Sequence, residues 1–198
     1  MKQFTKNKRQ PYKTGEKALG RKQAEAVLLA ARSYEETILV LIGFTLGQRR
    51  DDLVSIEIQN IDTDTGFLSY HEKKKGNRIK TVPLTDRLSH ELKLYIEQHT
   101  VLGQKYLFPP RQETHNCGHM SSKTAYNIFN DLCKMVGVPT PIPIHAMRST
   151  CIKLKQEEGW TIEEVATLIG DTVETVQEHY ATPSMADLSR LMKEKGGI

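Results

Sequence analysis

The spacing of apolar and polar residues predicts a chain that is mainly helical. Residues 34–46 are apolar on nearly every side, which is typical of a buried helix, and Gly47 directly after them is expected to end it. Apolar residues recur at helical spacing in several other stretches. The helices predicted on this basis cover residues 22–32, 85–99, 123–136, 146–158, 161–169, 173–180 and 185–195.

Two stretches between these helices have the character of β-strands. Residues 67–72 and 78–84 lie on either side of a turn that contains Gly76 and Asn77, residues that suit a hairpin. Pro83 closes the second strand. The predicted fold is therefore mainly α with a small antiparallel β-sheet, an α+β arrangement.

Composition and charge are compatible with a polyanionic partner. The chain has 198 residues, enough for one domain with a hydrophobic core, and carries 28 Lys and Arg against 24 Asp and Glu. The basic excess is concentrated at the start, where residues 1–22 hold eight basic residues and one acid. Such an arm is either solvated or lies along the phosphates of a nucleic acid, and charge alone does not decide between the two.

The cysteines and the apolar runs indicate a cellular location and exclude some classes of protein. Three cysteines at wide spacing argue against a disulfide framework, so we expect a reducing, cytoplasmic location. No apolar run approaches the roughly 20 residues that span a membrane, and no signal peptide is visible. Residues 115–119 read His-x-Cys-x-His, but this spacing matches no common zinc site, so we expect an irregular loop and no metal.

Four segments that are far apart in the chain carry residue types that suit phosphoryl transfer. They are residues 47–53, the lysines at 73–75, residues 145–148, and residues 170–171 followed by 179–180. Guanidinium groups bind phosphate oxygens, lysine and histidine can move protons, and tyrosine can act as a nucleophile. Each segment alone is better explained as a surface ion pair, a solvated turn or a core aromatic residue. Their joint presence reverses that interpretation.

In order and spacing, these segments resemble the catalytic domain of tyrosine recombinases, the group of phage integrases and Xer-like proteins. Residues 46–53 are similar to the motif T-G-x-R-x-x-E-L, and residues 74–84 to the hairpin motif G-K-G-N-K-x-R-x-V-P-L. Residues 145–150 are similar to H-x-x-R-H-T. Residues 169–171 stand where the family has L-G-H, and Tyr180 follows ten residues after the glycine.

The resemblance implies a role for each matching residue. It places catalytic residues at Arg49, Lys75, His145, Arg148, Asp171 and Tyr180, supporting residues at Asp52 and His179, and DNA contacts at Lys73, Lys74 and Arg78. Asp52 would hold the first arginine or the histidine in place.

The chemistry implied is attack of Tyr180 on a DNA phosphodiester, which gives a 3′-phosphotyrosine and a free 5′-hydroxyl. Arg49 and Arg148 would stabilise the negative charge of the transition state. Lys75 would protonate the leaving oxygen, and His145 would orient the phosphate or accept the tyrosine proton. The resemblance implies that neither a metal nor a cofactor takes part.

Asp171 departs from the family pattern, which has His or Trp there as a donor to a phosphate oxygen. An ionised carboxylate only accepts hydrogen bonds, and it repels a phosphate. We therefore expect Asp171 to be turned away, to be protonated, or to pair with a cation such as Arg49 or Lys75. His179 would then supply the missing donor. Ser149, where the family often has histidine, is a smaller departure.

The predicted function is that of a site-specific recombinase or integrase that acts on double-stranded DNA and assembles on it as a tetrameric synapse. The alternatives are a DNA-binding module of the same fold that has lost catalysis through Asp171, and a helical regulator without phosphoryl transfer. The expected organisation is a basic arm over residues 1–21, a catalytic domain over residues 22–183, and a tail helix over residues 184–198 that docks on a neighbouring subunit. Family members usually carry a further N-terminal DNA-clamping domain, so this chain alone is expected to bind DNA weakly.

Overall fold

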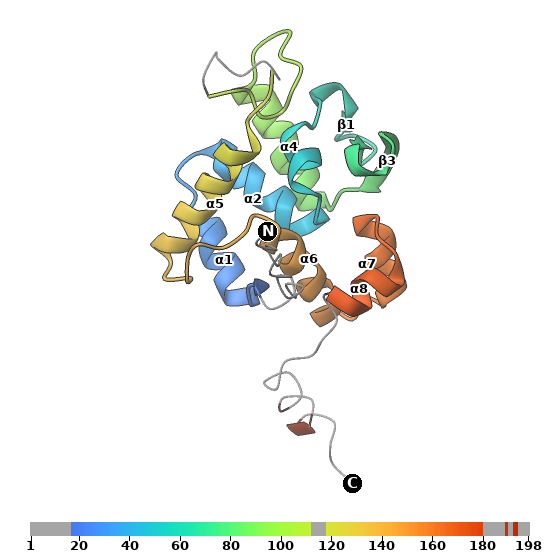
Figure 1. The fold of residues 1–198 in the computed structure, drawn as a ribbon. Helices are drawn as coiled ribbons and strands as arrows, with labels where there is room; N and C mark the ends of the chain where they lie inside the picture. Colours follow the sequence, from blue (N-terminus) through green and yellow to red (C-terminus); the bar gives the residue numbers. More distant parts are fainter. Residues whose placement is uncertain (1–16, 112–117, 180–188, 190–191, 194–198) are drawn as a thin grey trace, which may run out of the picture.

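The computed structural model describes residues 17–111, 118–179, 189 and 192–193, and these ranges form a mainly helical fold with a small antiparallel sheet (Figure 1). The predicted fold class is confirmed. The helices are α1 (Arg21–Leu29), α2 (Tyr34–Leu46), α3 (Arg50–Val54), α4 (Asp86–His99), α5 (Ser122–Met135), α6 (Ala146–Glu157), α7 (Ile162–Ile169) and α8 (Val173–His179). The strands are β1 (Ile61–Asp62), β2 (Phe67–Glu72) and β3 (Arg78–Pro83).

The central helix is α2, which has the bounds predicted from its nearly continuous apolar sequence. Gly43 lets α6 approach it closely, because a Cβ at this position would stand 2.5 Å from the sulfur of Met147. Gly47 then ends α2 in the left-handed conformation, with a φ of 59°. This turn changes the direction of the chain while Gln48 stays buried, and it places Arg49 at the N-cap of α3.

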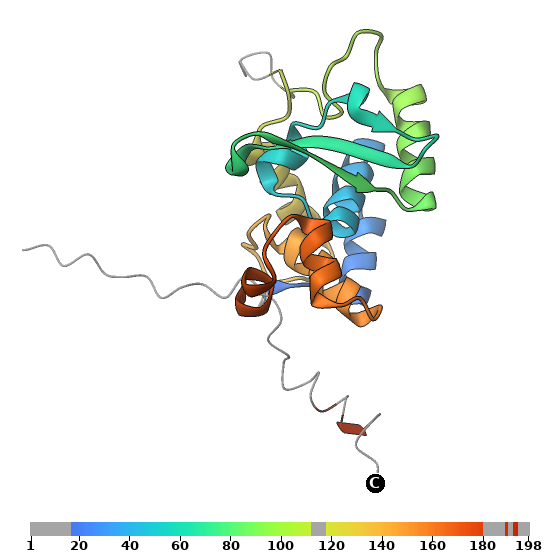
Figure 2. The ribbon, with the colours of Figure 1, turned by 90° about the vertical axis from the view of Figure 1, so that its right-hand side faces the viewer.

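The three strands form one antiparallel sheet in the order β1-β2-β3, and Glu72 stands opposite Arg78 at the end of the β2–β3 hairpin. A 3-10 turn over Lys73–Lys75 leads into Gly76 and Asn77, which both have positive φ, so the predicted hairpin is confirmed. Figure 2 shows β2 and β3 crossing the upper part of the molecule, with α7 and α8 below them. The hairpin therefore extends toward the end of α7.

Two hydrophobic clusters of unequal size hold the helices together. The larger one contains α2 and receives side chains from α1, α4, α5, the sheet and the start of α6. The smaller one joins the rest of α6 to α7 and α8 and consists of Cys151, Ile152, Val165, Ala166, Leu168, Ile169 and Val176. The last two helices are thus packed on a core of their own.

Several predicted boundaries agree with the structure, and others differ for local reasons. Thr161 caps α7 with Glu164 in a capping box, and Gly170 ends it, as predicted. α1 stops at Leu29 rather than at residue 32, because the backbone N–H of Arg32 donates to Glu36 of α2 at 2.9 Å. The short elements α3 and β1 were not predicted.

Some predictions fall on parts of the chain outside the described residues. The basic arm lies almost wholly there, as does most of the tail helix. The proposed domain boundaries therefore stay predictions. Among the residues described, no helix combines the length and the apolar character that crossing a membrane requires.

Candidate active site

Arg148 is the buried cation at the centre of the site. It lies in the first turn of α6, and only 1% of the residue is exposed. Its Nη1 donates to the carbonyl oxygens of Gly47 at 2.6 Å and Ile169 at 2.8 Å, so one guanidinium joins the ends of α2 and α7. Its Nη2 donates to Asp171. These bonds fix both the position and the direction of the guanidinium.

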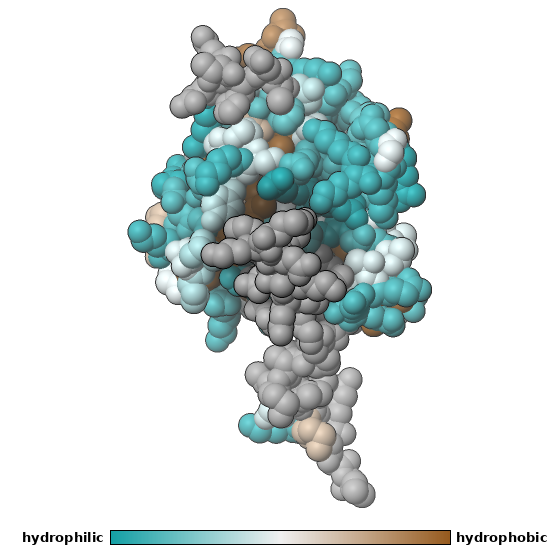
Figure 3. All heavy atoms as spheres, in the orientation of Figure 1, coloured by the Kyte–Doolittle hydropathy of each residue, from teal (hydrophilic) through white to brown (hydrophobic). Residues whose placement is uncertain are grey.

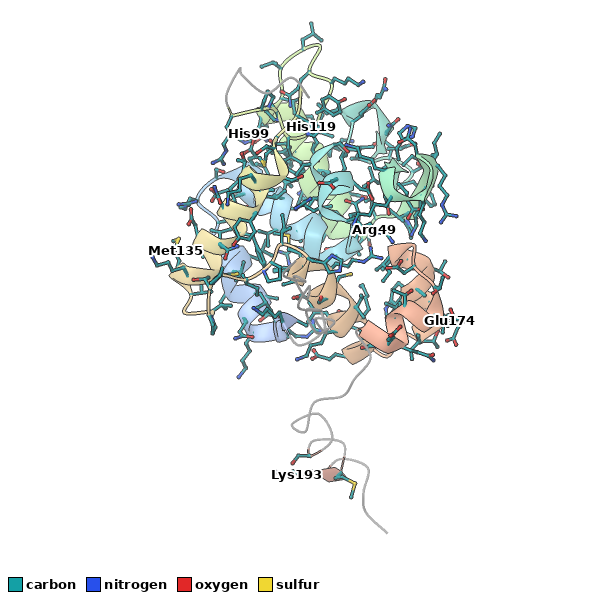
Figure 4. The ribbon with its side chains drawn as sticks, in the orientation of Figure 1. Arg49, His99, His119, Met135, Glu174 and Lys193 are labelled. Carbon is teal, nitrogen blue, oxygen red and sulfur yellow. The ribbon has the colours of Figure 1, made fainter. Side chains whose placement is uncertain are left out.

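The second arginine of the site is Arg49, which stands at the position before α3 and is labelled in Figure 4. Its Nη1 donates to Glu72 at 3.1 Å, and its Nη2 donates to Asp171 at 2.7 Å and to the carbonyl of Gly170 at 3.3 Å. The two predicted arginines, which are far apart in sequence, thus meet at one turn. The guanidinium N–H groups of the two arginines are hydrogen-bond donors that could bind the oxygens of an anion.

Asp171 joins these two arginines. One carboxylate oxygen accepts from Arg49 and the other from Arg148. Of the three arrangements considered for this residue, the structure has the one in which it pairs with cations, and Arg148 is a partner that the sequence did not suggest. Asp171 follows Gly170 in the link between α7 and α8.

The hairpin contributes a third cation to the same turn. Nζ of Lys75 donates to the carbonyl of Gly170 at 2.7 Å. Lys73, Lys74 and Arg78 are all exposed, and Arg78 also donates to Glu72 at 2.6 Å, so their predicted contacts with DNA stay predictions. The face shown in Figure 3 is mainly hydrophilic around the hairpin.

Glu72 is a residue of the site that sequence reasoning missed. It is fully buried and accepts from both Arg49 and Arg78. Burial alone would raise the pKa of this carboxyl, but the hydrogen bond and charge of Arg78, together with nearby lysines, hold the pKa below its usual range. A signal was present, because Leu68, Tyr70 and Glu72 alternate along β2, which places an acid on the inward-facing side of the strand.

Lys80 is the second missed residue. Its Nζ donates to the carbonyl oxygens of Thr167 at 2.8 Å and Leu168 at 2.6 Å, at the end of α7. Burial lowers the pKa of Lys80 to about 8, although the charge of Glu72 opposes this. Lys75 and Lys80 together bind the hairpin to the C-terminal end of α7, where the unpaired carbonyl groups of a helix favour cations.

His145 and Asp52 lie in the same region. His145 is partly buried and Asp52 is fully buried. Burial, followed by the charge of Arg148, lowers the pKa of His145 to about 4, so its imidazole is neutral at pH 7. Asp52 accepts a hydrogen bond from the backbone N–H of Lys73 at 3.1 Å, and burial raises its pKa. The carboxylates that pair with Arg49 are those of Glu72 and Asp171, so these residues, and not Asp52, hold the first arginine. The alternative, that Asp52 holds His145, stays a prediction.

The remaining predicted residues are not described by the structure. Tyr180 lies outside the described residues, and so does the side chain of His179, the last residue of α8. Part of the His-x-Cys-x-His stretch is also outside them. Over the ranges that are described, no group of three or more His, Cys, Asp or Glu residues is arranged to hold a metal ion.

Comparison with known sequences gives the family. Residues 17–186 match the model of the phage integrase family. Among curated proteins, the chain is 27% identical over 136 residues to the tyrosine recombinase XerA of Pyrococcus furiosus, covering 68% of this chain and 46% of the relative. It is 22% identical over 139 residues to a tyrosine recombinase of Pseudothermotoga lettingae, covering 70% and 46%. The chain spans about half the length of the curated relatives it matches.

Solved structures share the fold. The crystal structure of XerA recombinase matches with a TM-score of 0.77 at 18% identity, over 91% of this chain and 66% of that one. The Tn1549 transposon integrase in complex with transposon right end DNA matches with a TM-score of 0.68 at 14% identity, over 91% and 66%. A lambda integrase dimer bound to a COC' core site matches with a TM-score of 0.66 at 19% identity, over 87% and 49%. The chain therefore belongs to the phage integrase family and has the fold of a tyrosine recombinase catalytic domain.

Proposed function

We propose that this chain is the catalytic domain of a site-specific DNA recombinase or integrase that cuts and rejoins strands through a 3′-phosphotyrosyl intermediate. Tyr180 is the nucleophile in this proposal. The observation that carries it is the convergence of Arg49, Arg148 and Lys75 on the turn that joins α7 to α8. α8 ends at His179, so the chain runs directly from it into the tyrosine.

The two arginines stabilise the negative charge that develops on the phosphate oxygens. Arg148 is suited to this role because carbonyl groups already orient it, so no reorganisation is needed at the moment of reaction. Its Nε is buried and has no hydrogen-bond partner among the described residues, which leaves one donor for a further acceptor. Glu72 keeps Arg49 beside it.

Proton transfer is assigned to Lys75 and His145. The tyrosine oxygen attacks phosphorus while the bond from phosphorus to the 5′ oxygen breaks, and Lys75 gives that oxygen a proton. The tyrosine proton passes to His145, whose neutral imidazole can accept it and whose pKa rises once a phosphate lies nearby. Ligation runs the same steps in reverse with a 5′-hydroxyl from another strand.

The partner proposed is double-stranded DNA in the cytoplasm, with assembly into a tetrameric synapse. Two of the similar solved structures are integrases in complex with DNA, and one of them is a dimer. The exposed Lys73 and Lys74 of the hairpin, with Arg78 at its base, support this partner, because clustered basic side chains attract phosphates. The chain spans about half the length of its curated relatives. Tight binding of DNA is therefore expected to need contacts that these residues alone do not supply.

A DNA-binding module without catalysis is the second candidate, and Asp171 is the observation that favours it. Its carboxylate occupies both arginines that the reaction requires. If the phosphate cannot take its place, the chain binds DNA without cutting it.

The test is covalent trapping on a pool of nicked duplexes whose sequence around the nick is randomised, with Tyr180→Phe as the control. The proposed function predicts a protein–DNA adduct that survives denaturation and disappears in the control. A mobility shift without an adduct supports the second candidate. Absence of both, at protein concentrations high enough to detect weak binding, contradicts both functions.

A further inference from the structure

The carboxylate of Asp171 matches a phosphodiester in the features that guanidinium groups recognise. A phosphodiester has one negative charge shared by two non-bridging oxygens, and a carboxylate has one negative charge shared by two oxygens. In the structure each oxygen of Asp171 meets a different arginine, Arg49 at 2.7 Å and Arg148 at the other side. This is the arrangement expected for the phosphate under the proposed function.

We propose that Asp171 is an internal occupant of the phosphate position, which the phosphate must displace and which thereby sets the affinity of the site for phosphate. The inference rests on the proposed function for the identity of the natural ligand. It differs from a hydrogen-bond donor role, because the carboxylate competes with the ligand rather than binding it. An ionised acid at this position lowers the affinity for phosphate, and the loss grows with the strength of its own ion pairs with the two arginines.

The arginines keep their places when Asp171 leaves. Nη1 of Arg49 is held by Glu72, which is fully buried and bonds Arg78 as well. Nη1 of Arg148 is held by the carbonyl groups of two helix ends, as described above. Displacement of Asp171 therefore frees a donor on Nη2 of each arginine, while the other hydrogen bonds of both guanidinium groups remain, including that from Nη2 of Arg49 to Gly170.

The side chain of Asp171 can leave the arginines by turning toward solvent. Its side chain keeps 14% of its surface exposed, so a change of rotamer brings the carboxylate to water. Its backbone N–H stays bonded to Ala166 at 3.0 Å, which allows the side chain to turn without unwinding α7.

The experiment measures binding of inorganic phosphate to the complete 198-residue chain by calorimetry, at constant ionic strength in chloride buffer. Asp171→Asn removes the competing charge while keeping the shape, and it is expected to bind phosphate at least about 10-fold more tightly than the wild type. Asp171→Ser serves as a second variant if the first does not fold. Glu174→Gln is the matched control, because it removes one negative charge from an exposed residue at the start of α8 and is expected to change the affinity by less than about 2-fold.

The inference is overturned if the folded Asp171 variants bind phosphate no more tightly than the wild type, or not at all. It is also overturned if Glu174→Gln raises the affinity as much, since the effect is then one of net charge. Covalent trapping on DNA decides the proposed function separately. A chain that shows the expected phosphate affinities and yet forms no adduct supports the displaceable carboxylate and contradicts recombinase activity.

Discussion

The two carboxylates that pair with Arg49 come from different regions of the molecule and are held in different ways. Glu72, at the end of the hairpin strand β2, is fully buried and also bonds Arg78. Asp171, in the link between α7 and α8, is partly exposed and belongs to the region that packs on the smaller hydrophobic cluster. Two ion pairs of the same kind can therefore serve different ends, since Glu72 positions Arg49 permanently and Asp171, under the proposal above, keeps a place for a ligand.

Glu72→Gln is expected to cause the largest loss of stability, about 3–5 kcal/mol, because it removes a fully buried carboxylate that pairs with the mostly buried Arg49 and with the more exposed Arg78. The lowered pKa of Glu72 means that its contribution is complete above the ordinary carboxyl range and is lost as pH falls through the pKa of the folded state. Urea unfolding of the wild type and the variant should therefore differ most at pH 7 and converge in acid.

The matched variant for that experiment is Asp171→Asn. Its expected loss is smaller, about 1–3 kcal/mol, and added phosphate should recover it, because phosphate replaces the missing carboxylate. Phosphate should not rescue Glu72→Gln. Equal losses that phosphate leaves unchanged in both variants would show that the two carboxylates are equivalent.

His145→Asn is expected to flatten the acid side of the stability profile. The pKa of His145 is about 4 in the folded protein and near 6.5 when unfolded, so the unfolded state binds the proton first and stability falls as pH drops between these values. This contribution amounts to roughly 3 kcal/mol, and the variant should lack it.

Nuclear magnetic resonance titration of the His145 ring provides an independent check. A pKa near 6.5 in the folded wild type contradicts the assignment. Because the charge of Asp171 favours the protonated ring, Asp171→Asn should lower the pKa of His145 further. This result would show that the charge of Asp171 acts on the ring of His145.

Gly170→Ala tests the contact between the hairpin and the end of α7. We expect it to lower the free energy of unfolding by about 2–3 kcal/mol. Gly170 has a φ of 69°, and a Cβ there would stand 2.5 Å from Oε1 of Glu72 and 2.8 Å from Nζ of Lys80. The control is Gly137→Ala, which has a similar φ of 73° but open space around it, and should cost only about 1 kcal/mol for the left-handed backbone. Thermal unfolding measures both, and equal losses would mean that contact with Glu72 is unimportant.

Arg78→Met is expected to have the smallest effect, about 1 kcal/mol. Its side chain is 59% exposed, and the buried Glu72 keeps its bond from Arg49 when Arg78 is removed. The same unfolding measurement checks this. A loss as large as that of Glu72→Gln would show that Arg78, and not Arg49, is the main partner of the carboxylate.

The sequence predicted the longer elements well because they carry both a period and an end signal. Residues 34–46 are apolar throughout and stop at a glycine, and α7 begins with a capping box at Thr161. α3 has five residues and β1 has two, which is too few for apolar spacing to become visible. Their existence depends on the sheet and the helices against which they pack.

The motif order located Arg49, Arg148, Lys75 and Asp171, which the structure brings to one turn. Glu72 was missed although the alternation along β2 marks it as an inward-facing acid. Lys80 was missed because its importance depends on where the end of α7 lies, which only the tertiary structure shows. The same reason explains why Arg148 was not foreseen as a partner of Asp171. The roles of Tyr180 and His179 stay predictions, since the side chains lie outside the described residues.

Helix α6 belongs to both hydrophobic clusters, with Ala146 and Met147 in the larger and Cys151 and Ile152 in the smaller. Its first turn, which carries Arg148, is therefore anchored in the main core, whereas its later turns support α7 and α8. A sub-global opening of the smaller cluster can release the last two helices while the first turn of α6 stays folded. Such an opening would take the carbonyl of Ile169 away from Arg148 and leave the guanidinium its bond to the carbonyl of Gly47, so the arrangement of the buried cation depends on the docking of the last two helices.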